Sequence, residues 1–214
     1  MHHVIVFAGG DAPPASVRDR LPPDAVAIAA DSGLEHAQAL GRTVDVVVGD
    51  LDSVDRAALD RAMASGTAVE SHPPDKDATD LELALDAAVA RGATTVTVVG
   101  GYGGRVDHFL ANVLLLGHER YAAITLDAWI GTAHVVVIRD DVTLSGAVGS
   151  LCTLLAVGGP ASGVTTHRLR YPLSDATLLP GSTWGVSNVL LEPTARVTVA
   201  SGTLLSIQPN ALEH

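Results

Sequence analysis

Hydrophobic positions follow two different patterns in the two halves of the chain. In the first half, apolar runs are continuous, which is typical of strands buried on both faces of a parallel sheet. These runs are residues 4–8, 25–30, 44–48 and 96–99. Helices are predicted between and after them, at residues 34–40, 55–64, 80–91 and 108–117. The alternation predicts an α/β unit with a mostly parallel, open sheet.

Helical periodicity ends near residue 122. Short β runs follow, separated by turns rich in Gly, Pro, Ser and Asp, and this spacing is typical of an antiparallel sandwich or barrel. The runs are residues 123–130, 133–139, 151–157, 163–167, 189–191, 195–199 and 204–208. We therefore expect an α/β domain over residues 1–122 and an all-β domain over 123–214, although run 123–130 could belong to either.

Composition narrows the classes of function. The 214 residues carry a formal net charge of −11, which argues against a nucleic-acid partner, because phosphate chains are bound by clustered Lys and Arg. A nucleotide substrate remains possible, since bound Mg²⁺ can reverse the local field. A single cysteine, Cys152, excludes a disulfide framework, and no apolar run reaches membrane-spanning length. We expect a cytoplasmic protein that does not contact membranes.

Acidic residues cluster on both sides of the segment 53–74. Asp50 and Asp52 follow the apolar run that ends before Gly49, while Asp77 and Asp80 lie at the start of a predicted helix. Lys76, the only lysine of the chain, lies within the second cluster. Mg²⁺ prefers oxygen ligands, and it is usually held by one or two carboxylates together with substrate phosphates. The stretch 46–80 therefore predicts a magnesium and phosphate site.

The ends of other predicted strands carry similar residues. Asp31 follows the second strand, and a glycine-rich loop at 100–104 leads into Arg105 and Asp107. In an open parallel sheet these loops gather at one edge, where ligands bind. Arg105 is suited to bidentate phosphate binding, and Asp107 could orient Arg105, bind metal or act as a base. Each acid taken alone could instead cap a helix or simply be solvated.

A different enzyme class is also compatible with the segment VVVGDLDSV at 46–54. It resembles the first motif of haloacid-dehalogenase-type phosphatases, in which Asp50 would be the nucleophile and Asp52 an acid. Gly49 between strand and nucleophile, the distance from the start of the chain and the short spacing to the later acids argue against this alternative.

Five ordered motifs together resemble the thiamine pyrophosphokinase family. They are ADSG at 30–33, GDLDS at 49–53, PPDKDATD at 73–80, GGYGGRVDHFLAN at 100–112 and SNV at 187–189. The resemblance implies a catalytic α/β domain, a thiamine-binding β-sandwich, and a homodimer with active sites between subunits. The implied reaction converts ATP and thiamine to AMP and thiamine diphosphate with Mg²⁺. A relative that binds thiamine or nucleotide without turnover is the alternative outside the enzyme classes.

The resemblance also implies roles for individual residues. Metal binding falls to Asp50, Asp52, Asp77 and Asp80. Catalytic roles fall to Asp77, Asp80, Arg105 and Asp107, with the proton acceptor left open between Asp77 and Asp80. Substrate contacts fall to Asp31, Lys76, Arg105, Asp107 and His108 in the first domain, and to Tyr171, Trp184, Ser187 and Asn188 in the second. Tyr171 is the preferred aromatic for stacking on the thiamine cation, and Trp184 could instead line the rim of the pocket or fill the core.

Overall fold

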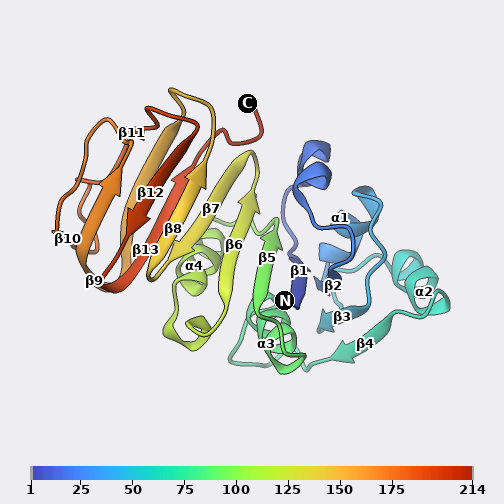
Figure 1. Cartoon of the computed structure of the whole chain (residues 1–214). Coiled ribbons are helices and arrows are strands. Elements are labelled where there is room, and N and C mark those ends of the chain that lie inside the picture. The colour runs from blue at the N-terminus through green and yellow to red at the C-terminus, as the bar shows by residue number, and fades with distance from the viewer. Residues whose placement is uncertain (1, 214) are drawn as a thin grey trace. The chain divides into compact units, whose positions relative to one another are not determined.

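Residues 2–213 are described by a computed structural model, in which the chain divides into two units (Figure 1). The first unit runs to Asn112 and includes Ala123–Gly131, and the second comprises Val113–Ala122 and the chain from Thr132 onward. Helix α4 (Val106–Leu116) contributes to both units. None of the helices in this described range is both long and apolar enough to cross a membrane.

The first unit is built on a parallel sheet. Its strands are β1 (His3–Phe7), β2 (Val26–Ala30), β3 (Val46–Gly49), β4 (Ala68–Ser71), β5 (Thr95–Val99) and β6 (Thr125–Ile130). They lie in the order β4-β3-β2-β1-β5-β6, and every neighbouring pair is parallel. The central strands β1, β2, β3 and β5 are almost wholly buried, as their continuous apolar runs predict. The predicted α/β class is confirmed.

The strand order reverses direction at β1. The chain lays β2, β3 and β4 on one side of β1 and then returns to place β5 and β6 on the other side. The two loops that leave the carboxyl ends of β1 and β5 therefore depart in opposite directions. Such a topological switch point leaves a crevice where ligands bind in open α/β sheets.

Helices connect the parallel strands. Those before β5 are η1 (Ala15–Arg20), α1 (Gly33–Ala39), α2 (Arg56–Ala64) and α3 (Asp80–Ala90), and α4 lies between β5 and β6. Helix α1 packs on β1 and β2, and α3 packs on β1, β2 and β3. Buried Leu81 and Leu85 fix the inner face of α3, so that its first residue, Asp80, lies at the same sheet edge as the ends of the strands.

The second unit is antiparallel. It contains η2 (Glu119–Tyr121) and strands β7 (Ala133–Ile138), β8 (Asp141–Ser145), β9 (Leu151–His167), β10 (Ala176–Leu178), β11 (Asn188–Val189), β12 (Thr194–Thr198) and β13 (Ser201–Gln208). Its strands lie in the order β7-β13-β9-β12-β8, with β10 and β11 also paired to β9. This confirms an all-β class for the C-terminal part.

One long strand replaces two predicted ones. The runs 151–157 and 163–167 are parts of β9, which continues through 17 residues. Gly158 (φ 72°) and Gly163 (φ 66°) let its backbone bend without ending the strand. The part before the bend pairs with β13 and the part after it pairs with β12, so β9 joins the two halves of this unit.

Run 123–130 forms β6, which pairs with β5 in parallel register from Thr95↔Thr125 onward. It therefore lies in the first unit. The division into a catalytic domain at 1–122 and a thiamine-binding domain at 123–214 stays a prediction.

Candidate active site

A cavity of about 540 Å³ opens in the first unit at the switch point. The loops that follow β1, β2, β3 and β5 contribute to its walls, together with the start of α3. The strand ends predicted to carry the site are thus brought to one place. Whatever binds there meets carboxylates on one side and glycine backbone on the other.

Two glycine segments form the backbone side of the cavity. The amide of Gly101 donates to the carbonyl of Gly9 (2.9 Å), and the amide of Asp11 donates to the carbonyl of Tyr102 (2.6 Å). Gly10 has φ 111°, and a Cβ added there would lie 2.1 Å from the Tyr102 carbonyl oxygen. Only glycine fits so close an approach, and glycine loops of this kind are a common place for backbone N–H groups to contact a phosphate.

Three carboxylates meet on the acidic side. One oxygen from each of Asp31, Asp50 and Asp52 can be chosen so that all three lie within 4.8 Å of one another. Asp31 is buried and adopts φ 48°, and its Oδ1 is buried without a hydrogen-bond partner. Burial raises the pKa of Asp31, against a hydrogen bond from the Ser32 backbone, and the charges of Asp80, Asp50 and Asp52 raise it further.

Lys76 bridges two acids of the site. Its Nζ donates to Asp50 Oδ2 (3.1 Å) and to Asp80 Oδ1 (2.5 Å), and both the Lys76 and Asp50 side chains are 13% exposed. The hydrogen bond from Lys76 holds the pKa of Asp50 below its ordinary value. Burial alone would lower the pKa of Lys76, but its bonds to Asp80 and Asp50 outweigh burial and raise that pKa.

The donor set fits a divalent cation. The Lys76 ammonium contacts two of the four carboxylates, Asp50 and Asp80, and the buried oxygen of Asp31 has no donor among the described residues. Hard carboxylate oxygens at this spacing are the ligands that Mg²⁺ takes. The acidic edge is therefore a candidate metal centre.

Asp80 is free for this role because another residue caps its helix. Thr79 Oγ1 accepts the hydrogen bond from the Glu82 amide (3.2 Å) at the start of α3. At the end of β3, Gly49 has φ 147°, and a Cβ there would lie 2.9 Å from Asp80 Oδ1 and 3.3 Å from Asp31 Cβ. The glycine before Asp50 thus gives the acids room to converge.

Arg105 and Asp107 form an exposed ion pair. Arg105 Nε donates to Asp107 Oδ1 (3.1 Å), and Nη2 donates to Oδ2. The hydrogen bonds from Arg105 lower the pKa of Asp107 to about 2. Arg105 and His108 line the cavity, whereas Asp107 does not. Asp77 is exposed and neither lines the cavity nor belongs to the three-acid group.

Several lining residues were not anticipated from the sequence. They are Ser32, Ser53, Thr79, Phe109 and Asn112. All five lie inside the first four motifs, but an uncharged side chain in such a motif does not by itself indicate a ligand contact. Phe109 packs edge-on against Tyr102, with ring centroids 5.4 Å apart.

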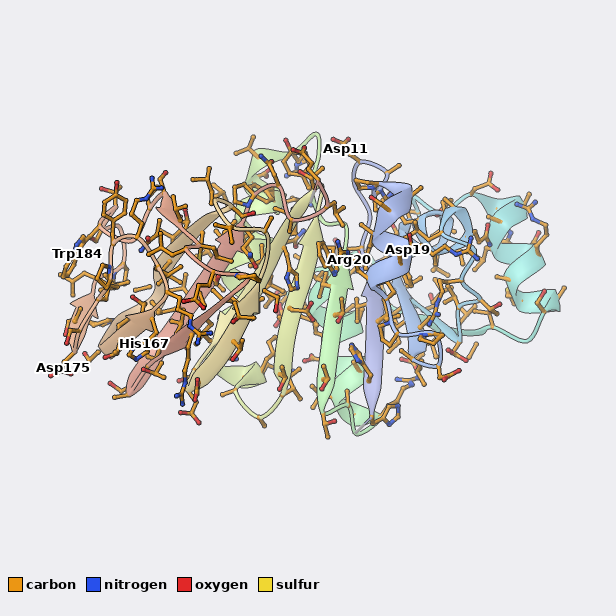
Figure 2. All side chains as sticks on the ribbon, turned by 45° about the horizontal axis from the view of Figure 1, so that its top comes forward. Asp11, Asp19, Arg20, His167, Asp175 and Trp184 are labelled. Carbon is orange, nitrogen blue, oxygen red and sulfur yellow. The ribbon has the colours of Figure 1, made fainter. Side chains whose placement is uncertain are left out.

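The predicted residues of the second unit differ in exposure. Tyr171 and Trp184 are 62% and 63% exposed, and Trp184 is labelled in Figure 2. Ser187 adopts φ 59° and its amide donates to Thr153 Oγ1 (3.1 Å). The Trp184 and Tyr171 rings are therefore surface groups, which excludes the alternative that Trp184 fills the core.

The Asn188 side chain is buried and hydrogen-bonds to the backbone of Tyr171 and Val189. Its Oδ1 accepts from the amides of Tyr171 (3.0 Å) and Val189 (2.9 Å), and its Nδ2 donates to the Tyr171 carbonyl (2.8 Å). In this structure the Asn188 side chain holds the backbone that presents the Tyr171 ring.

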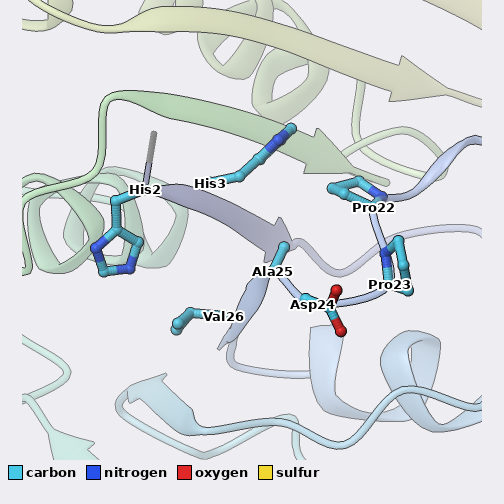
Figure 3. A pocket seen from close by; sticks show the side chains of 7 residues that line it. All are labelled: His2, His3, Pro22, Pro23, Asp24, Ala25 and Val26. Carbon is cyan, nitrogen blue, oxygen red and sulfur yellow. The ribbon is translucent and has the colours of Figure 1, made fainter.

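A second hollow, of about 650 Å³, lies beside the amino-terminal ends of β1 and β2 (Figure 3). His2, His3, Pro22, Pro23, Asp24, Ala25 and Val26 line it. It is larger than the first cavity, but Asp24 is its only carboxylate and it holds none of the predicted site residues. We therefore assign the site to the acidic edge.

The fold and the acidic edge place the chain in the class of α/β proteins that bind ligands at a switch point. Comparison with known proteins narrows this class. Residues 19–126 match the family model described as thiamin pyrophosphokinase, catalytic domain, and residues 134–204 match thiamin pyrophosphokinase, vitamin B1 binding domain. The chain therefore belongs to the thiamin pyrophosphokinase family of enzymes, and the phosphatase alternative is no longer proposed.

Individual relatives agree with this family. Thiamine pyrophosphokinase of Bacillus subtilis is 27% identical over 163 residues, covering 75% of this chain and 76% of the relative. Thiamine pyrophosphokinase 1 of Oryza sativa is 25% identical over 183 residues, covering 76% of this chain and 65% of that longer protein. A crystal structure of the Bacillus subtilis thiamine pyrophosphokinase matches with a TM-score of 0.84 and 24% identity, over 96% of this chain and 98% of that one, which supports the fold.

Proposed function

We propose that this protein transfers a pyrophosphoryl group from ATP to the hydroxyl of thiamine, with Mg²⁺, and releases thiamine diphosphate and AMP. The observation that carries the proposal is the meeting of Asp31, Asp50 and Asp52 beside a glycine-lined cavity in a member of this family. A cavity of about 540 Å³ is within the ordinary range for sites that bind small molecules.

Asp50 and Asp52 are the proposed metal ligands, and Asp31 is placed to join them. Asp80 is a further proposed ligand, because Lys76 bonds both Asp80 and Asp50. Asp77 is proposed as a ligand only from its match to the family motif. Mg²⁺ bound there would neutralise charge on the phosphate oxygens of ATP. Lys76 and Arg105 are proposed to contact those oxygens, with Asp107 orienting Arg105 and His108 on the substrate side of the cavity.

The proposed chemistry is a single displacement. The hydroxyl oxygen of thiamine forms a bond to the β-phosphorus of ATP, and the bond from that phosphorus to the oxygen bridging to the α-phosphorus breaks. AMP leaves with the electron pair of that bond, and the hydroxyl proton passes to Asp80 or Asp77. Catalysis of such a transfer rests mainly on positioning and charge neutralisation, so the fixed backbone and side-chain groups of the edge suit it.

Thiamine recognition is proposed for the second unit. Its family model is described as a vitamin B1 binding domain, and the exposed Tyr171 ring offers a face for a cationic thiazolium. Trp184 and Ser187 are proposed to border the same site, with Asn188 holding the Tyr171 backbone in place. A cytoplasmic homodimer with active sites between its subunits completes the proposal.

The test is a product analysis of purified protein with ATP, Mg²⁺ and thiamine. AMP and thiamine diphosphate should accumulate in equal amounts. Formation of ADP or inorganic phosphate in place of AMP would overturn the proposed reaction. Asp52→Ala should abolish turnover with little change in melting temperature, because Asp52 is an exposed loop residue, and light scattering would report the dimer.

A further inference from the structure

Glu35 lies outside the acidic group but is bound to the loop that carries part of it. It occupies the first turn of α1, and its Oε1 accepts a hydrogen bond from the backbone amide of Asp55 (2.7 Å). Its Oε2 is buried without a hydrogen-bond partner. A buried carboxylate oxygen without a partner carries an energetic cost, which calls for a compensating role.

The loop at 50–55 depends on such an attachment. Leu51 adopts φ 66°, a conformation that a non-glycine residue rarely takes. The Asp52 amide donates to Asp50 Oδ1 (3.3 Å) and Ser53 Oγ donates to Asp52 Oδ1 (2.8 Å), so these bonds shape the loop from within. They do not tie it to the rest of the unit.

Asp55 marks the exit of this loop. Its Oδ1 caps α2 by accepting from the Ala58 amide (2.7 Å), while its own amide is held by Glu35. At the entrance, Asp50 is held by Lys76. The Glu35 bond therefore fixes the end of the loop that Lys76 does not hold.

We propose that Glu35 is a positioning residue that sets the affinity of the acidic group for a divalent cation. Asp31 lies two residues before the start of α1, and Glu35 lies on α1, so one short helix fixes the place of Asp31 and of the loop that bears Asp50 and Asp52. The inference rests on the proposed metal site. Loss of the bond from the Asp55 amide to Glu35 would let Asp50 and Asp52 move away from Asp31, while the parallel sheet keeps its structure.

The expected loss of cation affinity can be sized from other metal sites, where residues that orient the metal ligands have been removed. Residues that orient metal ligands typically change metal affinity or activity about 10- to 100-fold when removed. Glu35 acts through the loop backbone and not directly on a ligand side chain, so the lower end, roughly 10-fold, is expected here. Because the bond lies at the end of a loop, the melting temperature should change little.

The experiment titrates Mn²⁺ into the whole protein without nucleotide and follows the free ion by electron paramagnetic resonance. Glu35→Ala removes the acceptor, whereas Glu35→Gln removes the same charge but keeps an oxygen at Oε1. Asp60→Ala removes a carboxylate of α2 that pairs with Arg56 and does not touch the loop. Hydrogen exchange of a peptide containing Asp55 reports the bond itself.

Glu35→Ala should bind Mn²⁺ more weakly than wild type, and its Asp55 amide should exchange hydrogen faster. Glu35→Gln and Asp60→Ala should match wild type in both measurements. Equal Mn²⁺ affinity in the Ala and Gln variants would overturn the inference. Wild-type protein that binds no Mn²⁺ would instead overturn the proposed metal site, and the inference with it. Should Glu35→Ala fail to fold, Glu35→Leu fills the same space without an acceptor and takes its place.

Discussion

Removal of the Lys76 ammonium should strengthen metal binding and weaken catalysis. Lys76 contacts Asp50 at 3.1 Å and Asp80 at 2.5 Å, so an incoming cation must compete with it for acids of the site. Lys76→Met keeps the length of the side chain and deletes the charge. The acids then face the cation without a competitor, but the proposed phosphate contact is lost.

The size of this effect can be bounded from the geometry. Opposite charges about 4 Å apart attract by about 4 kcal/mol at an effective dielectric constant of about 20, whereas exposed pairs are worth about 0.2–1 kcal/mol net. The Lys76 and Asp50 side chains are 13% exposed and that of Asp80 is 29% exposed, so solvent screens the pairs in part. A net competition of about 1–2 kcal/mol corresponds to roughly 5- to 30-fold tighter binding of the cation.

Calorimetric titration with Mn²⁺, without nucleotide, measures this change. Lys76→Arg, which keeps the charge, is the matched control and should bind close to wild type. In steady-state assays Lys76→Met should turn over more slowly and require more ATP. Unchanged or weaker Mn²⁺ binding in Lys76→Met would refute the view that the ammonium and the cation share these carboxylates.

Other predictions concern single contacts. Asn188→Ala leaves the backbone groups that it bonds at Tyr171 without their partner, and should lower the free energy of unfolding by about 2–4 kcal/mol in chemical denaturation; a loss below about 1 kcal/mol would contradict the buried role. Gly49→Ala places a Cβ against Asp80, and weaker Mn²⁺ binding is expected in the same calorimetric titration; unchanged affinity would count against the crowding. Burial lowers the pKa of His3 below 6.5, against the charge of a nearby acid, so the folded state binds fewer protons than the unfolded state as pH falls through 6.5. Stability should therefore decline from about pH 7 downward, and His3→Gln should flatten that decline in melting curves.

Periodicity was sufficient to predict β1, β2, β3 and β5 because these buried strands are continuous apolar runs and helices separate them. The same reasoning divided β9 in two, since the segment GGPASG at 158–163 is typical of a turn. Two glycines in left-handed conformation instead let a single strand bend there. Sequence pattern records which residues can turn, but pairing partners decide whether the chain does so. The short strands β8 and β10 were missed for a different reason, because neither contains a continuous apolar run.

The site was predictable where chemistry is carried by charged residues at strand ends. Sequence alone could not tell whether Asp31 caps a helix, and the structure shows that its Oδ1 has no such bond. Nor could it show that Asn188 bonds the backbone of Tyr171, 17 residues earlier in the chain, or that Glu35 accepts from the amide of Asp55. These residues act through contacts that only the folded chain brings together.

The central place of β1 has a consequence for how the protein is made. Its first residue pairs with Thr95, more than ninety positions later, whereas its other neighbour, β2, follows within the first thirty residues. The residues of β1 to β4, with the loops between them, are therefore synthesised roughly one to five seconds before β5 begins, at typical rates of about 5–20 residues per second. During that interval the repelling carboxylates are already gathered while the glycine segment 100–104 is absent. Lys76, which bonds Asp50 and Asp80, is the positive charge that this part of the chain itself supplies to those acids.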